Sequence, residues 1–151
     1  MKDRDEIRAQ FKAKGVPLTH QRLAVYEELS ARHDHPSAES LYESLKKSYP
    51  SLSLATVYKT LQTLHEMGMV ARVDSPTSQA RYDAIVGTHH HAVCVTCGRI
   101  EDLFDPRLDA LPRPKAGGFK VEGHSVHFHG LCAACAKAGR SKDARRLHRH
   151  G

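Results

Sequence analysis

The chain has 151 residues, enough for one ordinary domain or two small ones. Two small domains would each bury a thin core, so a metal ion or an oligomer interface is expected to add stability. No apolar run reaches the length of a membrane span, and the mixed-charge start, residues 1–14, lacks the apolar core of a secretory signal. We therefore expect a cytoplasmic protein with no membrane partner, in which paired cysteines are metal ligands and not disulfides.

The net charge of +6 comes mostly from the C-terminal end. Of the 23 Lys and Arg residues, six lie in residues 137–151, which hold only one of the 17 acidic residues. A short basic segment with so few apolar residues is expected to be disordered, either as a solubilising tail or as a DNA-contacting arm. The charge therefore does not identify a nucleic-acid-binding domain by itself, and local patterns have to do so.

The first 70 residues have the pattern of helices. We expect four, over residues 4–14, 20–31, 38–47 and 54–67. The last three begin after residues that suit N-caps, Thr19, Ser37 and Ser53. A glycine at the end of the first and of the last helix suits a C-terminal turn.

From residue 69 the apolar period becomes that of strands. Short strands are expected over residues 69–73 and 80–86, around a turn at 75–78, and a further one over 119–128. Helices followed by a two-stranded hairpin are the outline of a winged helix-turn-helix. Because the composition changes after Gly87, we expect one domain over residues 1–86, a second over 87–136, and the basic tail over 137–151.

The helix expected over residues 54–67 suits DNA reading. Its apolar residues fall on one stripe, which would face the core. The opposite side is small, polar and lightly basic, with Thr56 and Lys59 on it and Tyr58 at its margin, as suits entry into a major groove. An ordinary amphipathic helix would look similar, but the helices before it and the hairpin after it favour DNA binding.

The only four cysteines form two pairs, Cys94-x-x-Cys97 and Cys132-x-x-Cys135. Each pair can present two thiolates from a tight turn, and four thiolates satisfy tetrahedral Zn²⁺. Such a site leaves no open coordination position, so we expect structural zinc and no catalysis there. Buried or disulfide-linked cysteines are the alternative.

Three consecutive histidines precede the first cysteine pair. In an extended segment His89 and His91 would share a face and His90 would point away. Asp83 and the pair Glu101-Asp102 lie near in sequence, and mixed imidazole and carboxylate ligands suit iron(II), manganese(II), zinc or nickel. A surface run of histidines without metal is the alternative.

These motifs resemble the ferric uptake regulator family over about residues 5–136. The resemblance is carried by SLATVYKTL over residues 53–61, HHHAVCVTCG over 89–98, Gly123-His124 and the last cysteine pair. It implies an α+β homodimer, with an N-terminal winged helix-turn-helix and a small C-terminal α/β dimerisation domain that holds the four-cysteine zinc site. It also implies a repressor that binds double-stranded operator DNA when a divalent metal is bound, with no small-molecule substrate and no catalytic residues.

The resemblance implies a regulatory Fe²⁺ or Mn²⁺ site that ties the two domains together, made by His35, Asp83, His89, His91 and Asp102. Aspartate at the last of these positions is similar to the peroxide-sensing branch of the family, since the iron-uptake branch typically has Glu there. The adjacent Glu101 leaves the register open. In the peroxide-sensing branch iron(II) reacts with hydrogen peroxide, a histidine ligand is oxidised, here His35 or His89, and the protein leaves its DNA.

Further site residues follow from the same resemblance. An additional metal site matches His90, Asp109 and His124, although Thr88 stands where members usually have a histidine. DNA contacts match Lys14, Arg22, Thr56, Tyr58 and Lys59. The last of these is commonly Arg, so a bidentate guanine contact is lost and the sequence preference is expected to be relaxed. Prolines at 112 and 114 would truncate a helix that members usually carry.

Three other functions are alternatives to a peroxide-sensing repressor. An iron-, manganese-, nickel- or zinc-uptake regulator would share the architecture without peroxide sensing. A metallohydrolase would need an open coordination position, a substrate pocket and a general base, and the sequence indicates neither pocket nor base. A metal-storage protein would leave the helices and hairpin unexplained.

Overall fold

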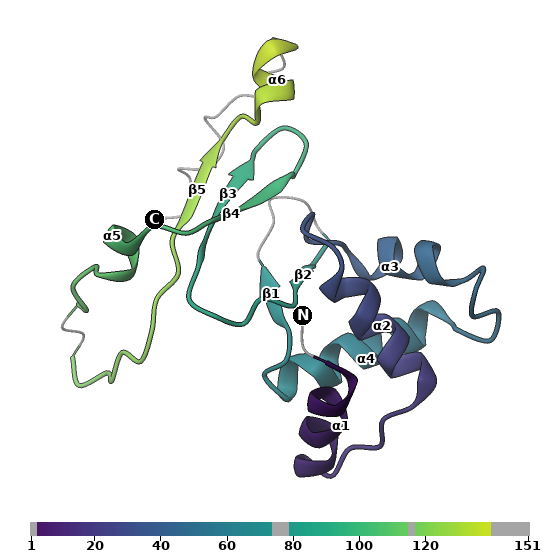
Figure 1. Ribbon diagram of the computed structural model, residues 1–151. Coiled ribbons are helices and arrows are strands. Elements are labelled where there is room, and N and C mark those ends of the chain that lie inside the picture. The colour runs from purple at the N-terminus through teal and green to yellow at the C-terminus, as the bar shows by residue number, and fades with distance from the viewer. Residues whose placement is uncertain (1–2, 74–78, 115–116, 140–151) are drawn as a thin grey trace. The chain divides into compact units, whose positions relative to one another are not determined.

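The computed structural model describes residues 3–73, 79–114 and 117–139 (Figure 1). These residues fall into two compact units, one of residues 3–73 and 79–86 and one of residues 87–114 and 117–139. The elements in chain order are α1 (Arg4–Ala13), α2 (His20–Ser30), α3 (Ala38–Leu45), α4 (Leu54–Glu66), β1 (Ala71–Val73), β2 (Arg81–Asp83), β3 (His90–Cys94), β4 (Ile100–Leu103), α5 (Pro106–Asp109), β5 (His127–Gly130) and α6 (Ala133–Lys137).

The four helices of the first unit begin at side-chain caps. The hydroxyls of Thr19, Ser37 and Ser53 each accept a hydrogen bond from a backbone N–H of the first turn, which confirms these predicted N-caps. Asp3 forms a capping box with Glu6 at the start of α1. Only α3 is clearly shorter than predicted, since it ends at Leu45.

The core of the first unit lies among α1–α4 and includes the apolar stripe of α4. The side chains of Val57, Leu61 and Leu64 have no exposed area. Burial of one such side chain stabilises the fold by about 1.5–3 kcal/mol. Because this stripe faces the core, the opposite side of α4 is left at the surface.

The hairpin β1–β2 closes the first unit. Its strands pair antiparallel, with Arg72 opposite Tyr82. Both strands are shorter than the predicted ranges 69–73 and 80–86, and the predicted turn at 75–78 lies outside the described residues. The N–H of Tyr82 donates to the carbonyl oxygen of Pro36, so β2 also holds the loop between α2 and α3.

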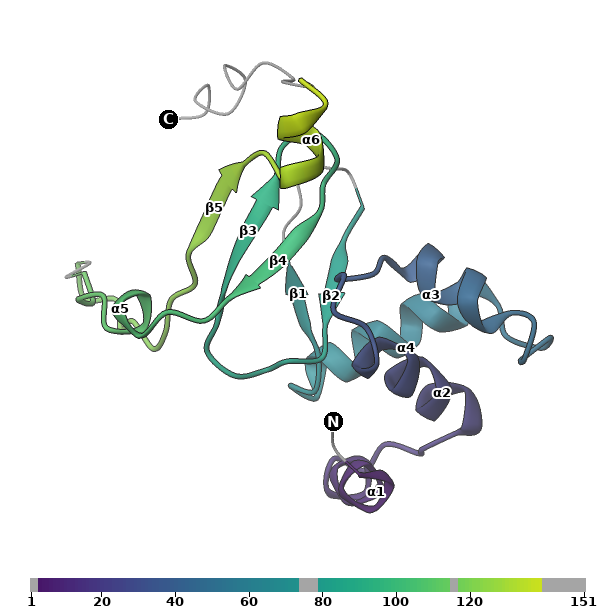
Figure 2. The ribbon, with the colours of Figure 1, turned by 45° about the horizontal axis from the view of Figure 1, so that its top comes forward.

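The second unit is a three-stranded sheet in the order β4-β3-β5 (Figure 2). β4 is antiparallel to β3, and β5 is parallel to β3. The chain therefore passes through β4, α5 and a long connection before β5 pairs with β3. The prediction of a strand over residues 119–128 is wrong, because β5 begins at His127. The side chain of Phe119 is 78% exposed, and a strand there would have no apolar face to bury.

The helix between β4 and β5 has a single turn. α5 ends at Asp109, shortly before Pro112 and Pro114, in line with the expected truncation. The C-terminal residues 140–151, which make up most of the expected basic tail, lie outside the described residues. Within the described ranges, no helix combines the length and apolar character needed to cross a membrane.

Candidate metal centres and DNA-reading helix

The four cysteines gather at one end of the second unit. Cys94 ends β3 and Cys97 lies in the following turn, where Gly98 has a φ of 73° that favours glycine. β5 runs beside β3 and leads into α6, which carries Cys135 and is preceded by Cys132 at its N-cap. The four sulfurs lie within 4.8 Å of one another, and none forms a disulfide.

The cluster is shaped to hold a cation. Burial alone would raise the pKa of the Cys94 thiol, but N–H groups of Cys132, Cys97 and Thr96 lower it to about 6. Burial and the neighbouring thiols raise the pKa of Cys135 to about 12. Four thiolates repel one another, so they ionise together only when a divalent cation offsets their charge. Four sulfur donors and no others fit tetrahedral Zn²⁺.

In the first unit, His35 and Asp83 lie side by side. His35 belongs to the loop between α2 and α3, and Asp83 ends β2. Nε2 of His35 is 3.6 Å from Oδ2 of Asp83, and both side chains are buried, with 2% and 6% exposed. The other carboxylate oxygen of Asp83 accepts from the N–H of Ile85. This pair offers an imidazole nitrogen and a carboxylate oxygen to an ion.

In the second unit, His89, His91 and Asp102 form the matching group. His91 lies opposite Asp102 in the β3–β4 ladder, and Oδ1 of Asp102 is 3.6 Å from Nε2 of His89 and 3.8 Å from Nε2 of His91. Nδ1 of His89 lies 2.8 Å from the carbonyl oxygen of Gly87. Because that carbonyl can only accept, Nδ1 carries the proton and Nε2 is the nitrogen available to a metal.

The two groups contain three imidazoles and two carboxylates. Such a donor set suits divalent first-row ions, from manganese(II) to zinc. Glu101 does not belong to it, since this residue lies opposite Ala92, is exposed and pairs with Arg99 at 2.9 Å. The carboxylate that lies beside His89 and His91 is that of Asp102.

His90 points away from His89 and His91, as expected for an extended segment. Its Nδ1 accepts from the N–H of Val126 at 3.1 Å, so its Nε2 carries the proton and donates to Asp109, also at 3.1 Å. The ring of His124 stacks on that of His90. Thus His90, Asp109 and His124 come together, but both ring nitrogens of His90 are used in hydrogen bonds.

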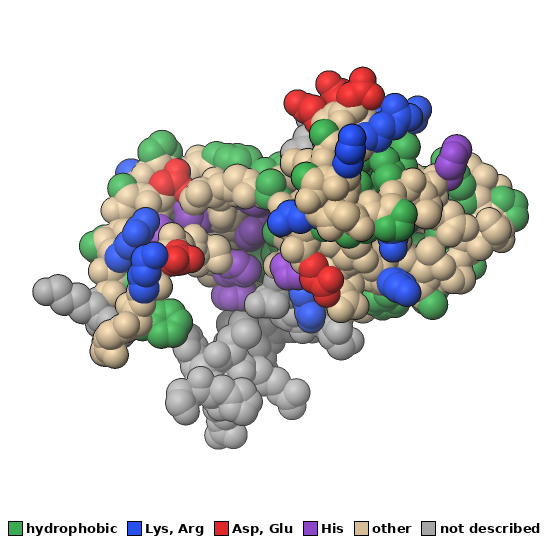
Figure 3. Space-filling view, turned by 90° about the horizontal axis from the view of Figure 1, so that it is seen from below, with side chains coloured by type: hydrophobic (Ala, Val, Ile, Leu, Met, Phe, Trp, Pro, Cys, Tyr) green, Lys and Arg blue, Asp and Glu red, His purple; other side chains and the backbone are tan. Residues whose placement is uncertain are grey.

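The residues matched to DNA contacts lie in the first unit. Thr56, Tyr58 and Lys59 lie on α4, and the side chain of Tyr58 is 42% exposed. Lys14 is the C-cap of α1 and is exposed, whereas Arg22 donates to the carbonyl oxygen of Pro17. On the face seen in Figure 3, Lys and Arg side chains stand beside acidic ones and do not form one basic patch.

Sequence reasoning missed two features of this surface. The hydroxyl of Tyr58 donates to Glu39 of α3. A hollow beside α4 is lined by Tyr58, Lys59, Gln62, His65, Arg72 and Tyr82. The period of α4 indicated its own exposed residues, but nothing in the sequence alone paired them with residues of α3 or β1.

The chain is similar to known metal-dependent regulators over most of its length. The family model described as the ferric uptake regulator family matches residues 13–140. The peroxide operon regulator of Bacillus subtilis is 37% identical over 129 residues, which cover 84% of this chain and 89% of that protein. The solved structure of the Campylobacter jejuni peroxide stress regulator has a TM-score of 0.60 and 35% identity, covering 87% of this chain and 97% of that one.

The ferric uptake regulator of Helicobacter pylori shares the fold, with a TM-score of 0.72 at 22% identity over 91% of this chain and 92% of that one. The match to the family model includes the four cysteines and the histidines and aspartates of both groups. The chain therefore belongs to the ferric uptake regulator family and is a metal-dependent, DNA-binding repressor, not an enzyme.

Proposed function

We propose that this repressor senses hydrogen peroxide through an Fe²⁺ ion, or binds Mn²⁺ in its place, at a site made by His35, Asp83, His89, His91 and Asp102. The observation that carries the proposal is the aspartate at position 102, whose carboxylate lies beside His89 and His91. Relatives named for their response to peroxide, at 31–37% identity, support it.

One ion bound by both groups would join the two units. His35 and Asp83 belong to the first unit, and the other three ligands belong to the second. A metal ion that binds more tightly when the units are joined shifts the protein toward the joined arrangement. The size of the shift is set by the difference in metal affinity between the joined and the separated arrangement. The DNA-competent arrangement is then the metal-bound one.

Peroxide would act by removing a ligand. Bound iron(II) supplies the chemistry that activates hydrogen peroxide. In the net reaction one peroxide oxygen is inserted into a C–H bond of a histidine ring, and the other leaves as water. His35 and His89 are the two candidates. An oxidised ring is a poorer nitrogen donor, so the metal and then the DNA are released, once per molecule and without turnover.

The remaining roles rest on the same family membership. Zinc on Cys94, Cys97, Cys132 and Cys135 would hold the second unit together, and residues 87–136 would form the homodimer. Exposed apolar side chains of that unit, Phe104, Leu111, Phe119, Phe128 and Leu131, support this role. Residues 1–86 would bind operator DNA in the cytoplasm through Lys14, Arg22, Thr56, Tyr58 and Lys59.

Peroxide treatment of two metal forms tests the proposal. The Fe²⁺ and Mn²⁺ proteins are each bound to a labelled promoter duplex and exposed to hydrogen peroxide. We expect release of the Fe²⁺ form alone, with one oxygen atom added to a peptide that contains His35 or His89 by mass spectrometry. Asp102→Glu is the matched control, because it keeps a carboxylate: it should retain Mn²⁺-dependent DNA binding and be oxidised more slowly.

Release of neither form by peroxide would instead assign the chain to the metal-uptake regulators. Release without histidine oxidation would overturn the proposed chemistry while leaving the repressor role intact.

A further inference from the structure

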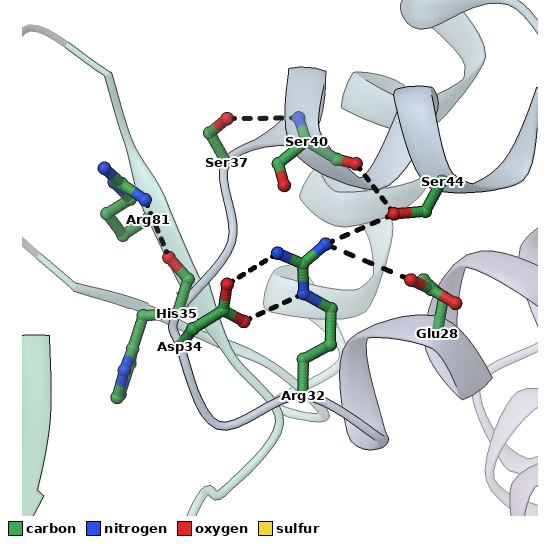
Figure 4. Close-up of polar contacts among 8 residues, drawn as sticks. All are labelled: Glu28, Arg32, Asp34, His35, Ser37, Ser40, Ser44 and Arg81. Carbon is green, nitrogen blue, oxygen red and sulfur yellow. Dashed lines mark hydrogen bonds and ion pairs between the residues drawn. The ribbon is translucent and has the colours of Figure 1, made fainter. Parts of the chain in front are cut away.

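The loop that carries His35 is held by an arginine that is not a metal ligand. The Arg32 guanidinium contacts Asp34 through two hydrogen bonds, Nε to Oδ1 at 2.8 Å and Nη2 to Oδ2 at 2.6 Å (Figure 4). Nη1 of Arg32 also lies 3.4 Å from Oγ of Ser44 and 3.9 Å from Oε1 of Glu28. A planar guanidinium with several partners fixes direction as well as distance. Arg32 therefore ties the loop to both α2 and α3.

The backbone of His35 requires this support. Its φ of 49° makes it the one non-glycine residue with a positive φ in the described ranges. This left-handed conformation is disfavoured for a residue with a Cβ and persists where the surroundings impose it. On the other side of the loop, Nη1 of Arg81 donates to the carbonyl oxygen of His35 at 3.3 Å. Contacts on both sides thus fix where the His35 ring points.

The same loop leads directly into α3. Oγ of Ser37 accepts from the N–H of Ser40 and caps the helix, and Oγ of Ser44 donates to the carbonyl oxygen of Ser40. Glu39 lies in the first turn, four residues after His35. Its Oε1 accepts from the hydroxyl of Tyr58 on α4 at 2.5 Å. Four residues of chain therefore lead from His35 to Glu39, and the hydrogen bond of Glu39 joins them to Tyr58.

We infer that residues 32–39 are a connection that couples metal binding at His35 to DNA reading by Tyr58, with Arg32 and Glu39 as its positioning residues. Arg32 sets the position of the His35 ring, and Glu39 sets the direction of the Tyr58 side chain. When metal holds His35, the loop and the first turn of α3 are held with it, and Tyr58 is presented in one orientation. The inference rests on the proposed roles of His35 and Tyr58.

Glu39 also places a negative charge beside the DNA-reading helix. A carboxylate there opposes contact with phosphate in general, so it weakens binding to DNA of any sequence. The hydrogen bond to the hydroxyl of Tyr58 holds the Glu39 carboxylate at this position. Loss of Glu39 should therefore strengthen non-specific binding and weaken the dependence of specific binding on metal.

The role of Glu39 and Tyr58 is tested by the ratio of the affinities for a promoter duplex with and without Mn²⁺. Glu39→Ala should lower this ratio about fivefold. Tyr58→Phe should lower the ratio equally, and the double variant should lower it no further, because both substitutions remove the same hydrogen bond. Glu39→Gln should restore most of the ratio, since an amide oxygen still accepts from the hydroxyl. Glu43→Ala, which removes an exposed charge of α3 paired with Lys46, is the matched control.

The role of Arg32 in positioning His35 is tested by direct titration of the protein with Mn²⁺. Arg32→Ala should weaken Mn²⁺ binding roughly tenfold, as loss of a residue that orients a ligand does. Arg32→Lys should recover part of the Mn²⁺ affinity, because lysine keeps the charge but not the two parallel hydrogen bonds. Arg8→Ala, which removes an exposed arginine paired with Asp5, is the control. At saturating Mn²⁺ the Arg32 variants should bind the duplex as the unaltered protein does.

Three results would overturn the inference: an unchanged Mn²⁺ ratio in Glu39→Ala, additive effects of Glu39→Ala and Tyr58→Phe, or unchanged Mn²⁺ affinity in both Arg32 variants. Failure of the unaltered protein to bind the duplex with Mn²⁺ would instead refute the proposed function, so the two failures are separate.

Discussion

At the scale of single residues, neighbours in the sequence have different tasks because a strand alternates its faces. Asp102 lies with His89 and His91, whereas Glu101 is exposed and pairs with Arg99. The period of two was sufficient to place His90 apart from the other two histidines. The hydrogen bond from His90 to Asp109, nineteen residues away, required the folded chain.

Substitution of one cysteine should empty the four-sulfur cluster. Cys94→Ser removes a thiol whose pKa is lowered by neighbouring N–H groups, and the three remaining sulfurs no longer complete a tetrahedral site. Because we propose that this ion holds the dimerisation half together, we expect loss of both zinc and dimer, seen by metal analysis and size-exclusion chromatography. A stable dimer without zinc would refute the structural role of the cluster.

His90 should matter for stability and not for metal content. His90 is fully buried, and His90→Leu leaves the half-buried N–H of Val126 without its partner, whereas the Asp109 carboxylate is 44% exposed and can turn to water. The expected cost is about 1–3 kcal/mol in the free energy of unfolding, measured by urea denaturation. The zinc and manganese content should stay as in the unaltered protein. Loss of one bound metal per chain would show that His90, Asp109 and His124 form a metal site after all.

At the scale of elements, α4 has a buried side and an exposed side. Leu61 is fully buried, so Leu61→Ala should cost about 2–5 kcal/mol by leaving a cavity. Gln62, next in sequence, is exposed and donates to Glu66, and Gln62→Ala should change stability by less than about 0.5 kcal/mol. Urea denaturation of both variants checks this. Equal costs would contradict the assignment of the two sides.

The helices and their N-caps could be predicted because they depend on residues that are close together in the sequence. The caps at Thr19, Ser37 and Ser53 were found because a hydroxyl needs only the next turn of its own helix. The strand expected over residues 119–128 was wrong because β5 is defined by pairing with β3, more than thirty residues earlier. Such non-local pairing, like the left-handed backbone of His35, is set by the folded surroundings and not by the residues themselves.

At the scale of the whole molecule, the proposed ligands of the regulatory ion belong to two compact units. His35 and Asp83 belong to the unit with α4, and His89, His91 and Asp102 belong to the unit with the cysteine cluster. In the proposed function one ion is bound by both groups, so metal binding would depend on the arrangement of the units. By linkage, that arrangement would depend equally on the metal.

The most direct test of this account is the affinity for DNA at one fixed salt concentration, with Mn²⁺ and after a chelator has removed it. Fluorescence anisotropy of a labelled duplex from the promoter of the chain's own gene provides the measurement. The account predicts at least tenfold tighter binding with Mn²⁺, within the usual range of coupling between sites. Equal affinity in the two conditions, or no binding to the duplex in either, would contradict it.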